Sequence, residues 1–157
     1  MTPRKVYLDN SATTQVDKRV LEAMLPYFSE DYGNPNSLHN WGREARKGVD
    51  RARAQVAGLI GAEPKDIIFT GGGSEADNLA IKGAAWALRD KGNHIITSSI
   101  EHHALLDTVK WLGKNGYDYT ILPVDETGMV DPKDLEAAIR PETILASIMY
   151  ANNEIGT

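Results

Sequence analysis

The spacing of apolar residues divides the chain into a helical first part and an alternating second part. Apolar positions recur with helical spacing from Asp17 to Phe28, and again over residues 41–59, where charged residues fill the opposite face. Between these two helices, residues 29–37 (SEDYGNPNS) have the composition of a loop. Residues 6–8 (VYL) are predicted to form a short strand. The first part is therefore predicted to be mainly helical.

After Gly61, short apolar runs alternate with amphipathic stretches. The predicted strands are DIIFT (66–70), NHIITSS (93–99), YDYTILPV (117–124) and TILASIMY (143–150). The predicted helices are 74–92, closed by Gly92, then 103–116, then 131–139 with Asp131 as cap and Pro132 as first residue. Strands and helices that alternate in this way form βαβ units. The fold class is therefore α/β, with a partial, doubly wound and mostly parallel sheet covered by helices on both faces.

Composition and charge narrow the kinds of protein to which the chain can belong. The 157 residues fit one domain, and 41% hydrophobic with 25% charged residues is ordinary for a globular protein. A net charge of −5 and the absence of a basic run argue against a nucleic-acid partner. The longest apolar run, residues 144–151, is too short to cross a membrane, and the N-terminus lacks a signal-peptide pattern. We therefore expect a cytoplasmic protein with no membrane partner.

The chain contains no cysteine. This excludes disulfides, thiolate metal sites and a thiol nucleophile within these residues. No metal site is predicted from the remaining residues.

The stretch TGGGSEADN, residues 70–78, carries the first chemical signal. A glycine-rich turn between a predicted strand and a predicted helix lets backbone N–H groups converge on an anion, which the helix dipole also favours. The Ser74 hydroxyl could add a donor. A tight turn that needs positive φ, followed by Ser74 as the helix cap, would explain the same residues without a ligand.

Three kinds of phosphate site compete for this turn. A nucleoside-triphosphate loop requires a Gly-Lys-Ser/Thr sequence, and the turn has no lysine. A dinucleotide fingerprint is formally matched by Gly71, Gly73 and Ala76, but it needs an acidic residue at the end of the next strand. That strand ends in residues 97–99 (TSS), and Glu101 lies beyond it. The third kind of site binds pyridoxal 5′-phosphate (PLP).

Other stretches of the sequence favour a PLP site at this turn. The chain resembles the N-terminal part of the cysteine desulfurases, which belong to the class V aminotransferase group of fold-type I PLP enzymes. The resemblance covers essentially the whole chain, in the family's order and spacing. The segments that carry it are YLDNSATT (7–14), YGNPNSLH (32–39), IIFTGGGSEADNLAI (67–81), and ITSSIEHHALLDT (96–108) with SIMYANNEIGT (147–157).

The resemblance implies roles for four residues. Gly73 and Ser74 match the positions that bind the cofactor phosphate, where the family more often has Ala-Thr. His102 matches the histidine that stacks on the pyridine ring and acts in proton transfer, as suits an imidazole near neutral pH. Asn153 matches the asparagine beside the cofactor and the substrate carboxylate, where an amide donates without adding charge.

Each of these residues also has a simpler explanation. EHH (101–103) could open a helix, with Glu101 and its neighbours as caps, and His103 is expected to be structural or on the surface. Asn153 could be a turn residue after a strand. Asn152 and Glu154 are expected to shape the loop.

The resemblance also indicates what these residues lack. In the family, the Schiff-base lysine, the aspartate that pairs with the pyridinium nitrogen, and the cysteine that takes up sulfur all come later in the sequence. We therefore expect residues 1–157 to be a single incomplete unit, inactive alone. In it, about residues 15–157 form part of a PLP-binding large domain and residues 1–14 form an extended segment leading into it.

For the parent enzyme the resemblance implies L-cysteine as substrate, alanine as product and persulfide sulfur bound to the enzyme. It further implies a homodimer and a sulfur-acceptor or scaffold protein as partner, in iron–sulfur cluster assembly. Two alternatives stay open at this point. One is a related enzyme such as a selenocysteine lyase, and the other is a non-catalytic half-domain that pairs with another chain.

Overall fold

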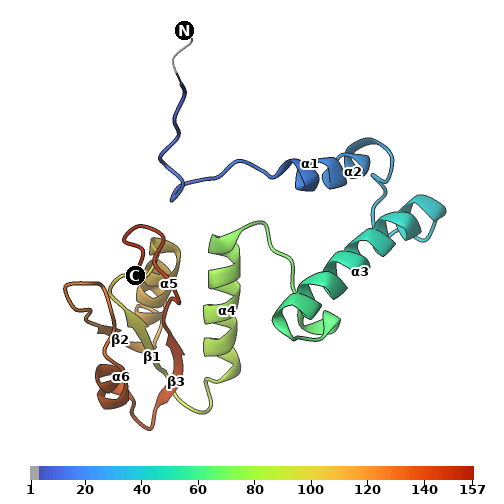
Figure 1. Ribbon diagram of the computed structural model, residues 1–157. Coiled ribbons are helices and arrows are strands. Elements are labelled where there is room, and N and C mark those ends of the chain that lie inside the picture. Colours follow the sequence, from blue (N-terminus) through green and yellow to red (C-terminus); the bar gives the residue numbers. More distant parts are fainter. Residues whose placement is uncertain (1–3) are drawn as a thin grey trace. The chain divides into compact units, whose positions relative to one another are not determined.

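The computed structural model describes residues 4–157, which divide into two compact units, residues 4–69 and Thr70–Thr157. The first unit contains helices and a segment, residues 4–14, without helix or strand. The second unit contains the sheet of the described residues and the helices that cover it (Figure 1). The boundary between the units falls within the predicted strand 66–70.

The helices of the first unit follow the apolar pattern. The stretch from Asp17 to Phe28 forms α1 (Lys18–Met24) and α2 (Pro26–Ser29), because Pro26 has no N–H to continue the first helix. The Asp17 carboxylate caps α1 by accepting from the Arg19 N–H at 2.8 Å. The long helix α3 (Asn40–Ile60) ends at Gly61, whose φ of 70° is the left-handed conformation that favours glycine.

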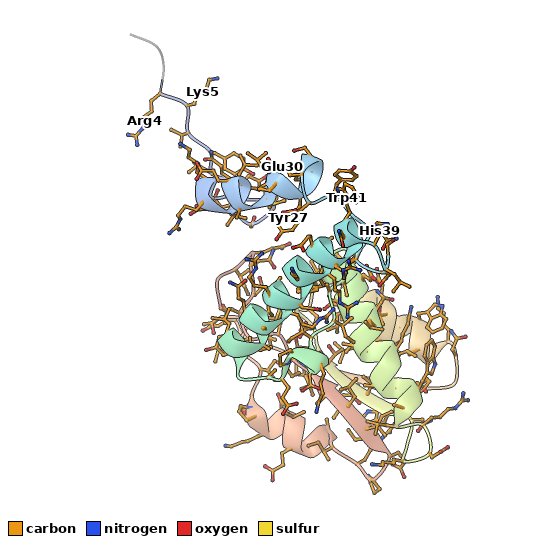
Figure 2. All side chains as sticks on the ribbon, turned by 90° about the vertical axis from the view of Figure 1, so that its right-hand side faces the viewer. Arg4, Lys5, Tyr27, Glu30, His39 and Trp41 are labelled. Atoms are coloured by element: carbon orange, nitrogen blue, oxygen red, sulfur yellow. The ribbon has the colours of Figure 1, made fainter. Side chains whose placement is uncertain are left out.

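Tyr27 connects α2 to α3. Its hydroxyl accepts a hydrogen bond from the Arg51 guanidinium at 3.2 Å. Figure 2 shows the Tyr27 side chain directed toward α3. A Cβ atom at Gly48 would lie 2.6 Å from the Tyr27 hydroxyl oxygen, so this contact depends on a glycine at that position of α3.

Two predicted strands are wrong. Residues 6–8 form no strand, and Leu8 is 89% exposed. Residues 66–70 follow the short 3₁₀ helix η1 (Pro64–Asp66) as irregular chain, in which Ile67 is buried but Ile68 is exposed. A strand needs a neighbour for its hydrogen bonds, and in residues 4–157 no strand lies beside either segment. An apolar run in the sequence therefore does not by itself make a strand, because it does not show whether a neighbouring strand is present.

The second unit has the predicted parallel sheet. Within residues 4–157 the sheet has three strands in the order β2–β1–β3, where β1 is His94–Ser98, β2 is Asp118–Leu122 and β3 is Thr143–Ser147. Helix α5 (His103–Gly113) connects β1 to β2, and α6 (Pro132–Ala138) leads from β2 past β1 to β3. These two crossovers run in opposite directions, so right-handed connections place α5 and α6 on opposite faces. The α/β, doubly wound fold class is confirmed, and β1 is buried along its whole length.

Helix α4 (Gly73–Ala87) packs against α5 and closes the core (Figure 1). The buried cluster consists of Ile81, Ala85, Ile95, Leu105, Val109, Leu112 and Tyr117. The prediction that Gly92 closes this helix is wrong, because the helix ends at Ala87. Gly92 instead allows a close approach of two chain segments, since a Cβ there would lie 2.3 Å from the Glu142 carbonyl oxygen.

His94 lies fully buried at the amino end of β1, where it joins the three strands. Its Nδ1 is 2.7 Å from the Thr143 hydroxyl on β3, and its Nε2 is 2.9 Å from the Thr120 hydroxyl on β2. Burial lowers the pKa of His94, and the positive charge of Arg140 lowers it further. The native state therefore holds this imidazole in its neutral form.

We expect the free energy of unfolding to fall as the pH drops below about 6.5, the ordinary pKa of a histidine. Below that pH the unfolded chain binds a proton at His94 that the native state does not bind. Each further pH unit then costs up to about 1.4 kcal/mol, until the lowered native pKa is reached. Urea unfolding at several pH values measures this slope. His94→Asn should reduce it and His103→Asn, at an exposed histidine, should not; equal slopes in all three proteins would contradict the account.

Candidate active site

The loops that follow β1 and β3 lie at one edge of the sheet. The two strands are parallel neighbours, so their carboxyl ends meet there. His102 is in the loop after β1, and Asn153 is in the loop after β3. Two residues 51 positions apart in the sequence are thereby brought to the same edge, which is where open α/β sheets bind ligands.

The glycine turn leads into α4. Gly72 holds the cap position, Gly73 is the first helical residue and Ser74 the second. The φ angle of Gly72 is 163°, which is extended backbone, and neither Gly71 nor Gly73 is among the described residues with positive φ. No side chain caps the helix. The explanation as a turn that requires positive φ with Ser74 as the cap is therefore wrong.

Crowding does not explain the glycines at this turn either. Apart from the adjacent residues and the backbone of α4 itself, no atom of the described residues lies within 4 Å of a Cβ built at Gly72 or at Gly73. The glycines leave open space in front of the first turn of α4, whose N–H groups have no partner within the helix. The Glu75 carboxylate, in the first turn of α4, accepts from the Gly71 N–H at 2.7 Å and so links the glycine turn to the helix. These features fit a phosphate group bound at the helix N-terminus.

His102 is the cap of α5. Its Nδ1 accepts a hydrogen bond from the Ala104 N–H at 3.0 Å, which assigns the ring proton of the neutral imidazole to Nε2. The capping explanation of EHH is confirmed for His102 and wrong for Glu101, which is not the cap residue. His102 and His103 are both exposed, and their rings meet edge to face with centroids 6.5 Å apart. Capping fixes the His102 backbone and one ring nitrogen, and leaves the ring at the surface of the site.

Two hollows meet at His102. One, of about 460 Å³, is lined by Ser74 and Lys82 of α4, by the cap residue His102, and by His103, Asp107 and Trp111 of α5. The other, of about 290 Å³, is lined by residues 99–103 and 152–155, and so includes His102 and Asn153. His102 therefore shares one hollow with Ser74 and the other with Asn153. The structure brings all the residues predicted from the sequence, Gly73 included, to one edge of the second unit.

Lys82 adds positive charge to the first hollow. Its ammonium lies 4.5 Å from the centroid of the Trp111 ring, a cation–π contact that holds the side chain over α5. In residues 4–157 no group of His, Cys, Asp and Glu side chains could hold a metal ion, and no helix is both long and apolar enough to span a membrane. The first hollow therefore has one cationic side chain, Lys82, and one anionic side chain, Asp107, and the second hollow is lined by the carboxylates of Glu101 and Glu154.

Two further residues shape the site. Asn152 was predicted to shape its loop, and it does so. Its amide donates to the Ile100 carbonyl at 2.9 Å, and its oxygen accepts from the Glu154 and Ile155 N–H groups at 2.8 and 3.0 Å. Glu101, predicted only as a possible cap, is buried. The sequence signal for Glu101 was an acidic residue three positions after the end of a buried strand.

The profile of the family described as aminotransferase class-V matches residues 6–157. The chain belongs to the aminotransferase class-V family. Cysteine desulfurase IscS of Methanosarcina thermophila is 58% identical over 154 residues, which are 98% of this chain and 38% of that protein. This class-V chain therefore spans about two-fifths of the length of such curated relatives.

Solved structures agree with this assignment. A structure described as a NifS-like protein superposes with a TM-score of 0.94 at 44% identity, covering 98% of this chain and 42% of that one. A structure described as SspA in complex with cysteine superposes with a TM-score of 0.86 at 42% identity, covering 92% of this chain and 42% of that one. The family resemblance found in the motifs is confirmed, and this class-V chain is similar to cysteine desulfurases along nearly its whole length.

Proposed function

We propose that the protein containing this chain is a PLP-dependent cysteine desulfurase and that residues 1–157 supply part of its cofactor site. The observation that carries the proposal is the meeting of Ser74, His102 and Asn153 at one edge of the sheet, in two hollows that share His102. The similarity to proteins named cysteine desulfurases supports L-cysteine as the substrate, with alanine and enzyme-bound sulfur as products.

Each residue of this chain has a defined task in the proposal. The N–H groups of the first turn of α4 and the Ser74 hydroxyl bind the cofactor phosphate. His102 lies against the pyridine ring and holds a proton at Nε2, because its Nδ1 is occupied by the Ala104 N–H. The Asn153 amide donates to an anionic oxygen beside the ring. PLP, when bound, supplies an electron sink for the substrate carbons.

Other groups of the reaction have to come from outside these residues. The chain has no cysteine, so a thiol that takes up the substrate sulfur cannot lie within residues 1–157. The proposal places the Schiff-base lysine outside them as well, by resemblance to the family. It further includes a homodimer, a cytoplasmic location, and a sulfur-acceptor or scaffold protein as partner, all of which rest on that resemblance.

The test is made with the native, untagged product of the whole gene. Incubated with PLP and L-cysteine, it should release alanine and, with a reductant, sulfide in equal amounts. The protein without PLP is the control. Turnover of selenocysteine with no turnover of cysteine would instead support a selenocysteine lyase, and bound PLP with neither activity would support the non-catalytic alternative. A bound nicotinamide dinucleotide would overturn the PLP assignment.

A further inference from the structure

Glu101 is the buried member of the sequence EHH. Its residue is 8% exposed, whereas His102 and His103 on its C-terminal side are exposed. Carboxylates are rarely buried without a partner, because leaving water is costly for a charged group. The burial of Glu101 therefore requires hydrogen-bond donors that hold the carboxylate in place.

The donors come from two different strand ends. The Ser98 hydroxyl, at the end of β1, donates to Glu101 Oε1 at 3.0 Å. The Met149 backbone N–H, just beyond β3, donates to the same oxygen. We call this pair of hydrogen bonds the Glu101 bridge. It joins the loop that carries His102 to the loop that carries Asn153.

Helix capping cannot account for this arrangement. The cap of α5 is His102, whose Nδ1 takes the Ala104 N–H, so Glu101 is not used by the helix. Its partner Met149 lies 48 residues further along the chain. Asn152 makes a second connection between the same two loops through the Ile100 carbonyl. The hollow lined by both loops also includes Glu101 itself.

We propose that Glu101 is a positioning residue that sets the distance between His102 and Asn153. The geometry of this inference comes from the Glu101 bridge. Its consequence, a change in PLP binding, rests on the proposed function. With the bridge intact, the imidazole and the amide face one bound ring from fixed places. Without it, the loop from Met149 to Thr157 keeps its connection through Asn152 but loses its anchor beside β1. The expected result is weaker cofactor binding with an intact fold.

The experiment compares Glu101→Ala, Glu101→Gln and Glu136→Ala in the native full-length protein. Glu136 is an exposed residue of α6 and provides the matched control. Hydrogen–deuterium exchange is followed separately for residues 148–157 and for the core strand β1, in protein without PLP. PLP affinity is measured on the same samples. Glutamine keeps an oxygen acceptor for the Met149 N–H, so it should restore what alanine loses.

We expect Glu101→Ala to speed exchange in residues 148–157 by about tenfold or more and to weaken PLP affinity by a similar factor, with exchange in β1 unchanged. Glu101→Gln should recover most of both effects. Unchanged exchange in residues 148–157 would overturn the proposal. A uniform rise in exchange that includes β1 would also overturn it, because that is the signature of a merely structural residue.

The two proposals fail in different ways. An unsubstituted protein that binds no PLP would contradict the proposed function, while the exchange comparison still decides whether Glu101 holds the two loops together. A protein that binds PLP equally well with and without the Glu101 bridge would contradict the positioning role alone. Should Glu101→Ala fail to fold, Asn152→Ala tests the second connection between the same loops by the same exchange measurement.

Discussion

Replacing His102 by asparagine is expected to lower the turnover of L-cysteine by about 10²- to 10⁴-fold while α5 keeps its stability. Asparagine is among the best helix caps, so it can accept the Ala104 N–H in place of Nδ1. It has neither a flat aromatic ring to lie against the cofactor nor a group that carries protons near neutral pH. Steady-state kinetics and thermal unfolding of the same protein measure the two effects separately.

Two further variants make this comparison decisive. His102→Ala should lose the same turnover and, in addition, about 1 kcal/mol of stability, because the cap is removed as well. His103→Asn alters the neighbouring exposed histidine, which lines both hollows but does not cap α5, and should lower turnover much less than His102→Asn does. Full turnover in His102→Asn would mean that His102 serves only as a helix cap.

Ser74→Ala is expected to weaken PLP binding by about 10- to 150-fold, the loss of one hydrogen bond to a charged group. Ser74 lies on the first turn of α4 beside glycines that leave open space, and it lines the hollow that includes His102. Its hydroxyl is the side-chain donor that the turn itself offers to a phosphate. Equilibrium dialysis against PLP, with the protein at constant concentration, gives the affinity.

Matched substitutions at the same turn serve as controls. Ser74→Thr keeps the hydroxyl and should keep most of the affinity. Gly73→Ala adds a methyl group where the described residues, apart from the adjacent chain and the backbone of α4, place no atom within 4 Å, so the fold should tolerate it. Affinity that is the same in Ser74→Ala and Ser74→Thr would place the phosphate elsewhere.

The elements that the sequence predicts well are those whose signals are local. Helix α6 has its cap at Asp131, which accepts from the Lys133 N–H at 2.8 Å, and Pro132 as first residue, as the sequence pattern indicates. The strands β1, β2 and β3 lie inside their predicted ranges, because apolar runs bounded by turn residues fix them. The turn at residues 70–74 was found for the same reason, since its composition is visible over five consecutive positions.

Features that depend on contacts with residues distant in the sequence cannot be predicted from such local patterns. The apolar runs at 6–8 and 66–70 look like strands, yet no strand of residues 4–157 lies beside them. Gly92 looks like a helix end, but its role is set by the Glu142 backbone 50 positions away. Glu101 looks like a cap, and its actual partner Met149 is contributed by another strand end. In each case the deciding contact is long-range, and a single sequence does not contain it.

The resemblance to a family identified the ligand, which the composition of the glycine turn alone could not do. The glycine turn alone left a phosphate site and a ligand-free turn open, and only the four motifs together selected PLP. The structure then contradicted the explanation of the turn by positive φ and a Ser74 cap, because no glycine of residues 71–73 is in the left-handed conformation and no side chain caps α4. Roles for Ser74, His102 and Asn153 remain predictions, now with a common location.

The most direct test of the account is a crystal structure of the native full-length protein with PLP bound. The account predicts phosphate oxygens about 3 Å from the Ser74 hydroxyl and the first N–H groups of α4, with the pyridine ring against His102 and beside Asn153. A phosphate bound away from the α4 N-terminus, or a ring that contacts neither His102 nor Asn153, would contradict it.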